Sequence, residues 1–153
     1  MSRKTCRRVH YALVNPIRCA IEGAGVAQDG LLDKLRILEL SAIESFAKGR
    51  ATTDDWRAVA DFCNIAETMA LGGVGPEVLE ACAAAGAALT GAYRRHAAIG
   101  RLGVTGPQLQ ALRDLYQFHD LQRSSIARSE YERYIRMTAD RIRSAHPSLK
   151  VFI

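Results

Sequence analysis

Residues 76–100 read PEVLEACAAAGAALTGAYRRHAAIG, and this stretch decides the fold. Pro76 suits the first turn of a helix, where its missing N–H costs nothing, and Gly100 suits the position just past the end. The alanines between them, with Gly86 and Gly91, give this helix a very small surface. Each interior glycine costs about 1 kcal/mol relative to alanine. We expect the close approach of neighbouring helices to offset that cost, which predicts a central helix.

Two helices are predicted before this stretch. The first spans about 31–48, with Asp29 as a candidate N-cap and Gly49 just past its end. Apolar residues at spacings of three and four predict its buried face, which consists of Leu31, Leu35, Leu38, Ala42 and Phe46. The second helix begins at Thr52 or Thr53 and ends at Gly72, because a threonine followed by two acids is typical of a helix start.

After the alanine-rich helix, the segment Thr105-Gly106-Pro107-Gln108 matches a capping box and opens a further helix. Its helical pattern continues to Pro147, which is long for a globular protein, so we expect a break near Ser124-Ser125. The apolar tail 151–153 is expected to dock on the rest of the chain. The sequence therefore predicts an all-α, single-domain bundle of four or five helices over 29–153, preceded by an irregular basic N-terminal arm, residues 1–28.

The charge is arranged in blocks along the chain. The formal net charge is +5, and residues 1–21 hold five basic side chains and no acidic one. Residues 22–93 hold 5 basic and 11 acidic side chains, and residues 94–153 hold 11 basic and 5 acidic ones. Such blocks bear on partners and association rather than on fold. The acidic and basic halves either complement each other within the fold or present separate charged surfaces.

Composition points to a globular protein of the cytoplasm. No segment is long and apolar enough to cross a membrane, and the basic start is not followed by the apolar run of a secretory signal. The four cysteines, Cys6, Cys19, Cys63 and Cys82, form no C-x-x-C pair, and we expect them to be reduced.

No catalytic or metal pattern is specific enough to predict an enzyme. Cys6, His10 and Cys19 offer soft ligands, but their spacing matches no strong zinc pattern. His119 lies on a helical pattern, where a histidine is more often structural than catalytic. The glycines of 72–75 lack the lysine and the strand that a phosphate-binding loop requires, and are typical of helix ends. We expect no metal, no cofactor and no enzymatic activity.

Nucleic acid is one candidate partner. The basic side chains that would contact phosphates lie in the arm and on the last helix: Arg3, Lys4, Arg7, Arg8, Arg128, Arg136 and Arg143. Acids such as Glu130, Glu132 and Asp140 dilute the basic face of that helix.

A protein partner suits the charge blocks better. An acidic surface from the first half of the chain would bind a basic partner, or mimic DNA and occupy a basic channel. The candidate residues for that surface are Asp29, Asp33, Glu39, Glu44, Asp54, Asp55, Asp61 and Glu67. The sequence does not determine the oligomeric state.

Several segments resemble a family of small uncharacterised proteins carried by proteobacterial phages, prophages and plasmids. The matching segments are Val14-Asn15-Pro16-Ile17, residues 51–56, Asn64-Ile65-Ala66-Glu67, residues 105–112, His119-Asp120 and Gln122. The resemblance spans roughly residues 1–125. It implies an accessory protein of a mobile element that binds a host protein or ribonucleoprotein complex, for example as an inhibitor of a host defence such as CRISPR–Cas. It implies no established activity.

Overall fold

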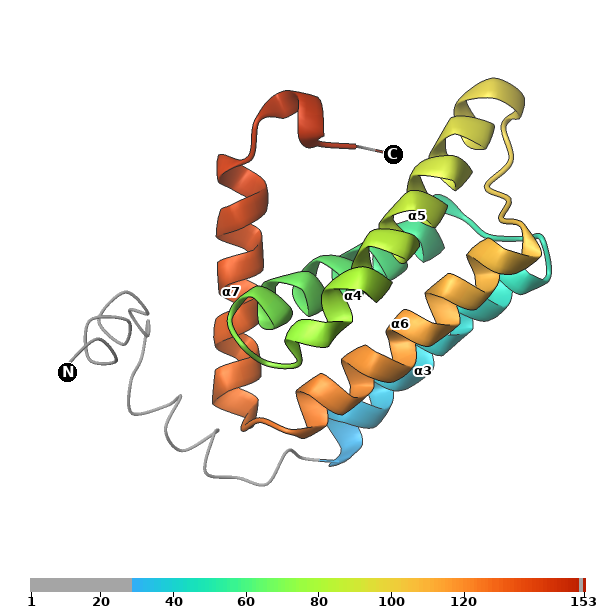
Figure 1. Cartoon of the computed structure of the whole chain (residues 1–153). Coiled ribbons are helices and arrows are strands. Elements are labelled where there is room, and N and C mark those ends of the chain that lie inside the picture. Colours follow the sequence, from blue (N-terminus) through green and yellow to red (C-terminus); the bar gives the residue numbers. More distant parts are fainter. Residues whose placement is uncertain (1–28, 152) are drawn as a thin grey trace.

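The computed structural model describes residues 29–151 and 153, and in this part of the chain it contains five α-helices and no strand (Figure 1). The elements are α3 (Asp29–Ala47), α4 (Thr53–Leu71), η1 (Pro76–Val78), α5 (Leu79–Ile99), α6 (Gly106–Ser124), α7 (Arg128–Ser144) and η2 (Pro147–Leu149). The prediction of an all-α bundle is confirmed. The predicted arm, residues 1–28, lies outside the described residues.

Side-chain caps fix the beginnings of α4 and α6. At α4 the hydroxyl of Thr52 accepts a hydrogen bond from the Asp55 N–H at 3.2 Å, and the Asp55 carboxylate accepts one from the Thr52 N–H at 2.8 Å. Thr105 and Gln108 form the same reciprocal pair at α6. Each box satisfies donors that the first turn leaves without a partner, so both predicted starts are confirmed.

The centre of the bundle is α4, not the alanine-rich helix that the sequence predicted. Helix α4 packs against α3, α5, α6 and α7, whereas α5 packs mainly against α4, α6 and η1. The reason lies in side-chain size. Buried residues of α4 include Trp56, Phe62 and Met69, whereas α5 buries alanines, Cys82 and Leu89 and exposes much of its remaining surface.

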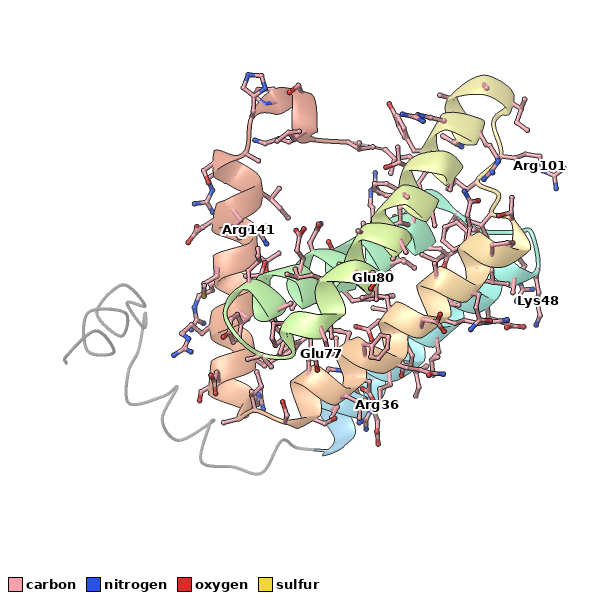
Figure 2. All side chains as sticks on the ribbon, viewed as in Figure 1. Arg36, Lys48, Glu77, Glu80, Arg101 and Arg141 are labelled. Atoms are coloured by element: carbon pink, nitrogen blue, oxygen red, sulfur yellow. The ribbon has the colours of Figure 1, made fainter. Side chains whose placement is uncertain are left out.

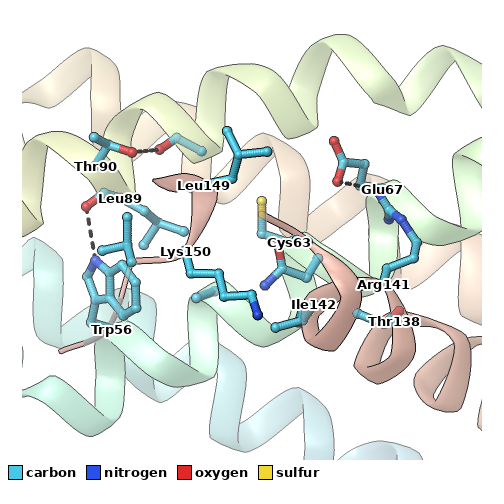
Figure 3. A pocket seen from close by; sticks show the side chains of 15 residues that line it. Trp56, Cys63, Glu67, Leu89, Thr90, Thr138, Arg141, Ile142, Leu149 and Lys150 are labelled. Atoms are coloured by element: carbon cyan, nitrogen blue, oxygen red, sulfur yellow. Dashed lines mark hydrogen bonds and ion pairs between the residues drawn. The ribbon is translucent and has the colours of Figure 1, made fainter. Parts of the chain in front are cut away.

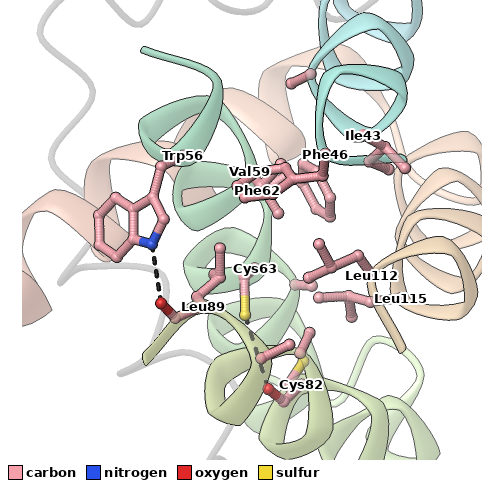
Figure 4. Packing of buried hydrophobic residues seen from close by; sticks show 14 of the residues in the cluster. Ile43, Phe46, Trp56, Val59, Phe62, Cys63, Cys82, Leu89, Leu112 and Leu115 are labelled. Atoms are coloured by element: carbon pink, nitrogen blue, oxygen red, sulfur yellow. Dashed lines mark hydrogen bonds between the residues drawn. The ribbon is translucent and has the colours of Figure 1, made fainter. Parts of the chain in front are cut away.

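The main core lies where α3, α4, α5 and α6 meet (Figure 4). Phe62 and Val59 of α4 meet Leu112 and Leu115 of α6, and all four side chains are buried. Trp56 lies at the edge of the core, where its indole N–H donates to the Leu89 carbonyl oxygen at 3.0 Å. This bond fixes the ring between α4 and α5.

The buried face of α3 differs from the predicted one. Ala42 and Phe46 are buried as expected, but Leu31 and Leu38 are exposed, and Glu39 is buried. Apolar residues surround this helix on almost every side, so their spacing alone does not select a face. The face is selected instead by Arg123 of α6, which binds Glu39.

The two glycines of α5 also differ from each other. A Cβ atom at Gly91 would lie 2.9 Å from the Gln108 amide nitrogen, so α6 does approach closely there. At Gly86 nothing lies within 4 Å of the missing Cβ. Close packing therefore explains Gly91, and the prediction that it would also explain Gly86 is wrong.

Helix α7 follows the predicted break and runs at a steep angle to α3, α5 and α6 (Figure 1). It is anchored by a small second core in which Tyr131 and Tyr134 pack with Met69. The chain then turns back, and Ile153 packs against the main core while the Arg57 guanidinium donates to its carbonyl oxygen. The expected docking of the tail is thereby confirmed for Ile153.

No helix in the described part of the chain combines the length and the apolar character needed to cross a membrane.

Candidate functional site

A buried ion pair joins α3 to α6. The Arg123 guanidinium donates a hydrogen bond to one carboxylate oxygen of Glu39 at 2.9 Å, and its other terminal nitrogen lies 2.8 Å from the second oxygen as an ion pair. Both side chains are buried. Arg123 also donates to Asp120, which accepts a second bond, at 2.9 Å, from Arg36 of α3. This group of four charged residues is called the α3–α6 clamp below. The ion pairs and hydrogen bonds of these four residues cross from α6 to α3, so the clamp restricts the rotation of α3 on α6.

Burial and hydrogen bonding act in opposite directions on these groups. Burial raises the pKa of Glu39, and the bonds from Arg123 only partly oppose that rise. Burial also disfavours the charge of Asp120, but its bonds to Arg36 and Arg123 lower its pKa below the ordinary value. The pKa of Arg123 is raised, because its bonds to Glu39 and Asp120 outweigh the cost of burial. The bonds from Arg36 and Arg123 thus favour the charged form of Asp120, whereas burial outweighs them at Glu39.

His119 lies beside the clamp and is completely buried. Its ring stacks on Phe62, and its two nitrogens lie 3.2 Å from the Gln122 side-chain oxygen and the Tyr131 hydroxyl. Burial, reinforced by the charge of Arg123, lowers the pKa of His119 from 6.5 to about 4. The imidazole is thus neutral at physiological pH, and each of its nitrogens has a buried side-chain partner.

The clamp leaves one side of α3 facing away from the bundle. Asp33, Ile37, Leu40 and Glu44 follow one another at spacings of four, three and four, so they share a helix face. Ile37 is 68% exposed and Leu40 47%, while Asp33 and Glu44 also reach solvent. We call these four residues the α3 outer stripe. It combines two exposed apolar side chains with two carboxylates.

The remaining predicted acidic residues do not join this stripe. Glu39 is buried, so it contributes nothing to an acidic surface. Asp55 caps α4, and Asp54 pairs with Arg57 one turn away. Asp61 is exposed on α4, and Glu67 pairs with Arg141 of α7. The side chain of Asp29 is not among those that the structure describes. Of the eight predicted acids, the structure places only Asp33 and Glu44 together in the outer stripe.

Two of the three predicted basic residues on α7 form ion pairs with acidic residues of the same helix. Arg128 bonds Glu132 at 3.0 Å, and Arg143 bonds Asp140 at 3.0 Å. Arg136 is half-buried. The other predicted phosphate contacts, Arg3, Lys4, Arg7 and Arg8, belong to the part of the chain that is not described, as do the candidate metal ligands Cys6, His10 and Cys19.

The acidic and basic halves of the chain meet inside the fold. Glu39 pairs with Arg123, Arg36 with Asp120, and Glu67 with Arg141, and each pair joins residues 22–93 to residues 94–153. The labelled charges of Figure 2 also lie at separate places: Glu77 and Glu80 near the start of α5, and Arg101 just beyond its end. Part of the excess acid in residues 22–93 and of the excess base in residues 94–153 is therefore neutralised by ion pairs within the fold.

A cleft of about 460 Å³ opens between α4, α5, α7 and the C-terminal segment (Figure 3). One row of α4 residues forms its floor, from Trp56 through Ala60 and Cys63 to Glu67. Gly86 and Leu89 line it from α5, and Ile142 from α7. Its charged lining groups are Glu67, Arg141 and Lys150. Arg141 is committed to Glu67 and to the Thr68 hydroxyl. Asn64, Thr90 and Thr138 add polar side chains to the lining. A cavity of this size that combines apolar and polar groups is within the range of ligand sites.

The thiols beneath the cleft are unreactive. Burial raises the pKa of Cys63 to about 12 and that of Cys82 to about 11, so both stay protonated at neutral pH. Protonated thiols are poor nucleophiles and poor metal ligands. Within the described residues, no three His, Cys, Asp or Glu side chains come close enough together to hold a metal ion.

Comparison of the chain with protein-family models, with curated proteins and with solved structures found no match to any of them. The resemblance to phage and plasmid proteins stays a prediction.

Sequence reasoning missed Ile37, Leu40, Gly86 and Lys150. The spacing that unites the outer stripe is visible in the sequence, because Asp33, Ile37, Leu40 and Glu44 recur at helical intervals. The cleft residues carry no such signal, since they come from four separate segments.

Proposed function

We propose that the chain is a non-enzymatic binding protein that recognises a macromolecular partner through the α3 outer stripe. The observation that carries the proposal is the exposure of Ile37 and Leu40 between two carboxylates on one face of α3. Exposed apolar side chains rimmed by charge are typical of protein interfaces, in which the apolar centre supplies affinity and the rim supplies orientation. A fitting partner offers an apolar pocket flanked by basic groups.

The α3–α6 clamp supports this role for the stripe. Because Arg123 holds Glu39 and Asp120 holds Arg36, the helix is fixed before a partner arrives. A fixed helix loses little conformational freedom on binding, which improves affinity without any additional contact. The carboxylates of Asp33 and Glu44 already share charge with Arg36 and Lys48, so we assign them to steering and specificity rather than to most of the affinity.

The proposed partner is a host protein or ribonucleoprotein complex in the cytoplasm. The resemblance to phage, prophage and plasmid proteins supports an accessory role in a mobile element, and within that role inhibition of a host defence such as CRISPR–Cas. Basic nucleic-acid channels of such complexes complement an acidic stripe. In this version Asp33 and Glu44 replace the broader acidic surface predicted from the sequence.

The test is affinity capture from a host lysate, with nuclease present. Ile37→Ser is compared with Ile99→Ser, because both isoleucines are 68% exposed and lie on different helices. Truncating an apolar anchor at the centre of an interface costs about 2 kcal/mol, close to a thirtyfold loss of affinity. We expect the wild-type chain and Ile99→Ser to capture the same partner and Ile37→Ser to lose it. Equal capture of the partner by both variants would exclude the α3 outer stripe as the binding surface.

A DNA- or RNA-binding regulator is the second candidate. The observation that favours it is the group of arginines on α7, Arg128, Arg136 and Arg143, which the basic arm would extend. It predicts an affinity that falls steeply with salt and weakens when Arg3, Lys4, Arg7 and Arg8 are replaced. Capture that depends on the absence of nuclease would favour this candidate, whereas no binding to duplex or single strands at low salt would exclude it.

A further inference from the structure

We propose that the cleft between α4, α5 and α7 binds a medium-chain alkyl carboxylate, with its chain along the α4 floor and its carboxylate at Lys150. This site is separate from the α3 outer stripe and does not rest on the function proposed above. Three independent features of the cleft carry the inference: the apolar part of its floor from Trp56 to Cys63, the empty space at Gly86 and the charge of Lys150.

The floor is long, and it is apolar from Trp56 to Cys63 before the polar residues Asn64 and Glu67. The α4 residues that line it recur from Trp56 to Glu67, a row of three helical turns that covers about 16 Å. Leu89 and Ile142 close the sides, and Leu149 and Val151 of the C-terminal segment lie over it. A cleft of about 460 Å³ is within the range of small-molecule sites. An extended alkyl chain matches this shape better than a compact polar ligand does.

The space at Gly86 is the second feature. A glycine inside a helix costs about 1 kcal/mol relative to alanine, and at Gly91 the close approach of Gln108 offsets that cost. At Gly86 no atom lies within 4 Å of the missing Cβ, so no close approach offsets the cost of the glycine. Because Gly86 lines the cleft, a side chain at this position would project into the cavity. The glycine keeps open a space that the protein itself does not fill.

The charge of the lining is the third feature. Glu67 and Arg141 neutralise each other at 3.0 Å. Lys150 forms no ion pair with any described residue, and its ammonium donates one hydrogen bond, at 3.0 Å, to the Arg143 carbonyl oxygen. An ammonium group has three N–H donors, so two remain for a ligand. Figure 3 shows the side chain extended between Trp56 and Ile142, where a carboxylate can meet it.

Trp56 provides the readout, because it is the single tryptophan of the chain and lines the cleft. The full-length protein is titrated with sodium decanoate below its micelle concentration while the fluorescence of Trp56 is recorded. Decanol and decyltrimethylammonium serve as uncharged and cationic probes of equal chain length. We expect a saturable change with decanoate, weaker binding of decanol and the weakest binding of the cation.

Two variants test the geometry. Lys150→Gln removes the cation, and we expect decanoate to bind about tenfold more weakly while decanol binding stays unchanged. Gly86→Leu places a side chain in the cavity beside α5 and should weaken the response to decanoate. The matched controls are Lys48→Gln on α3 and Gly106→Leu on α6, where nothing lies within 4 Å of the added Cβ either. Both should bind decanoate like the wild-type chain.

Several results would overturn the proposal. These are the absence of a saturable response to decanoate, equal decanoate binding by Lys150→Gln, or tighter binding of the cationic probe. If decanoate fails to bind and Gly86→Leu loses the captured partner, the cleft belongs to the macromolecular partner instead. Loss of capture by Ile37→Ser with decanoate binding intact would leave the two sites independent, as proposed.

Discussion

Helices α3 and α7 both flank the central helix α4, but they are held in different ways. Helix α3 is fixed by buried charges, since Arg123 and Glu39 form an ion pair and one hydrogen bond away from water. Helix α7 is held on α4 by Tyr131 and Tyr134 against Met69 and, further along, by hydrogen bonds from Thr138 and Arg141 to the Thr68 hydroxyl. The cleft opens between α7 and α5. Tight packing on one side presents a rigid surface, and loose packing on the other leaves room for a ligand.

Breaking the clamp should have the largest effect. Arg123→Met leaves the Glu39 carboxylate buried without its cation, and we expect this to cost about 3–5 kcal/mol of unfolding free energy. Urea denaturation followed by circular dichroism measures the loss. The double variant Glu39→Met with Arg123→Met removes both charges and should recover much of the stability. Arg143→Met, which breaks an exposed pair, should change stability by less than about 1 kcal/mol. An equally small effect of Arg123→Met would show that the clamp does not fix α3.

Acid should lower the free energy of unfolding through His119, which lies beside the α3–α6 clamp. Since the pKa of His119 falls from 6.5 to about 4 on folding, the unfolded chain binds a proton that the folded chain does not bind between these values. The neutral His119 side chain therefore contributes its full share to the free energy of unfolding above pH 6.5, and this share is lost as the pH falls toward 4. The loss is about 3 kcal/mol at most. Urea midpoints at several pH values measure it. His119→Gln should flatten this slope, whereas His146→Gln, at an exposed site, should keep it; a slope that survives His119→Gln would contradict the assignment.

The anchor of α7 is tested at Gly72. A Cβ atom there would lie 2.6 Å from the Tyr134 hydroxyl oxygen, so alanine must displace the ring. Overpacking of this kind typically costs about 1–3 kcal/mol. Thermal denaturation of Gly72→Ala measures the loss, and Gly106→Ala, where the space is open, is the control. Equal stability of the two variants would mean that α7 is not held at this point.

The smallest effect has the opposite sign. Gly86→Ala adds a methyl group to the open cleft and removes a glycine from a helix interior, so it should stabilise the protein by up to about 1 kcal/mol. Thermal denaturation beside Gly91→Ala measures the difference, because Gly91 faces Gln108 at close range. If Gly86→Ala destabilises the protein, the space at this position is not free.

The sequence was informative where a feature depends on neighbouring residues. The caps of α4 and α6 are local, and each was predicted from a few adjacent side chains, whereas the break before α7 was predicted from the length of the helical pattern. The buried face of α3 was not, because Glu39 meets an arginine 84 positions away. Gly86 and Gly91 look alike in the sequence, and only the position of α6 distinguishes them. The cleft combines four segments, so no local pattern predicts it.

The central claim is that the α3 outer stripe and the cleft are separate sites with different ligands. The most direct measurement is the dissociation constant of the captured macromolecular partner for Ile37→Ser and Gly86→Leu. The account predicts that Ile37→Ser weakens this binding at least tenfold and that Gly86→Leu leaves it unchanged. Unchanged binding by Ile37→Ser together with a loss for Gly86→Leu would contradict it and place the partner in the cleft.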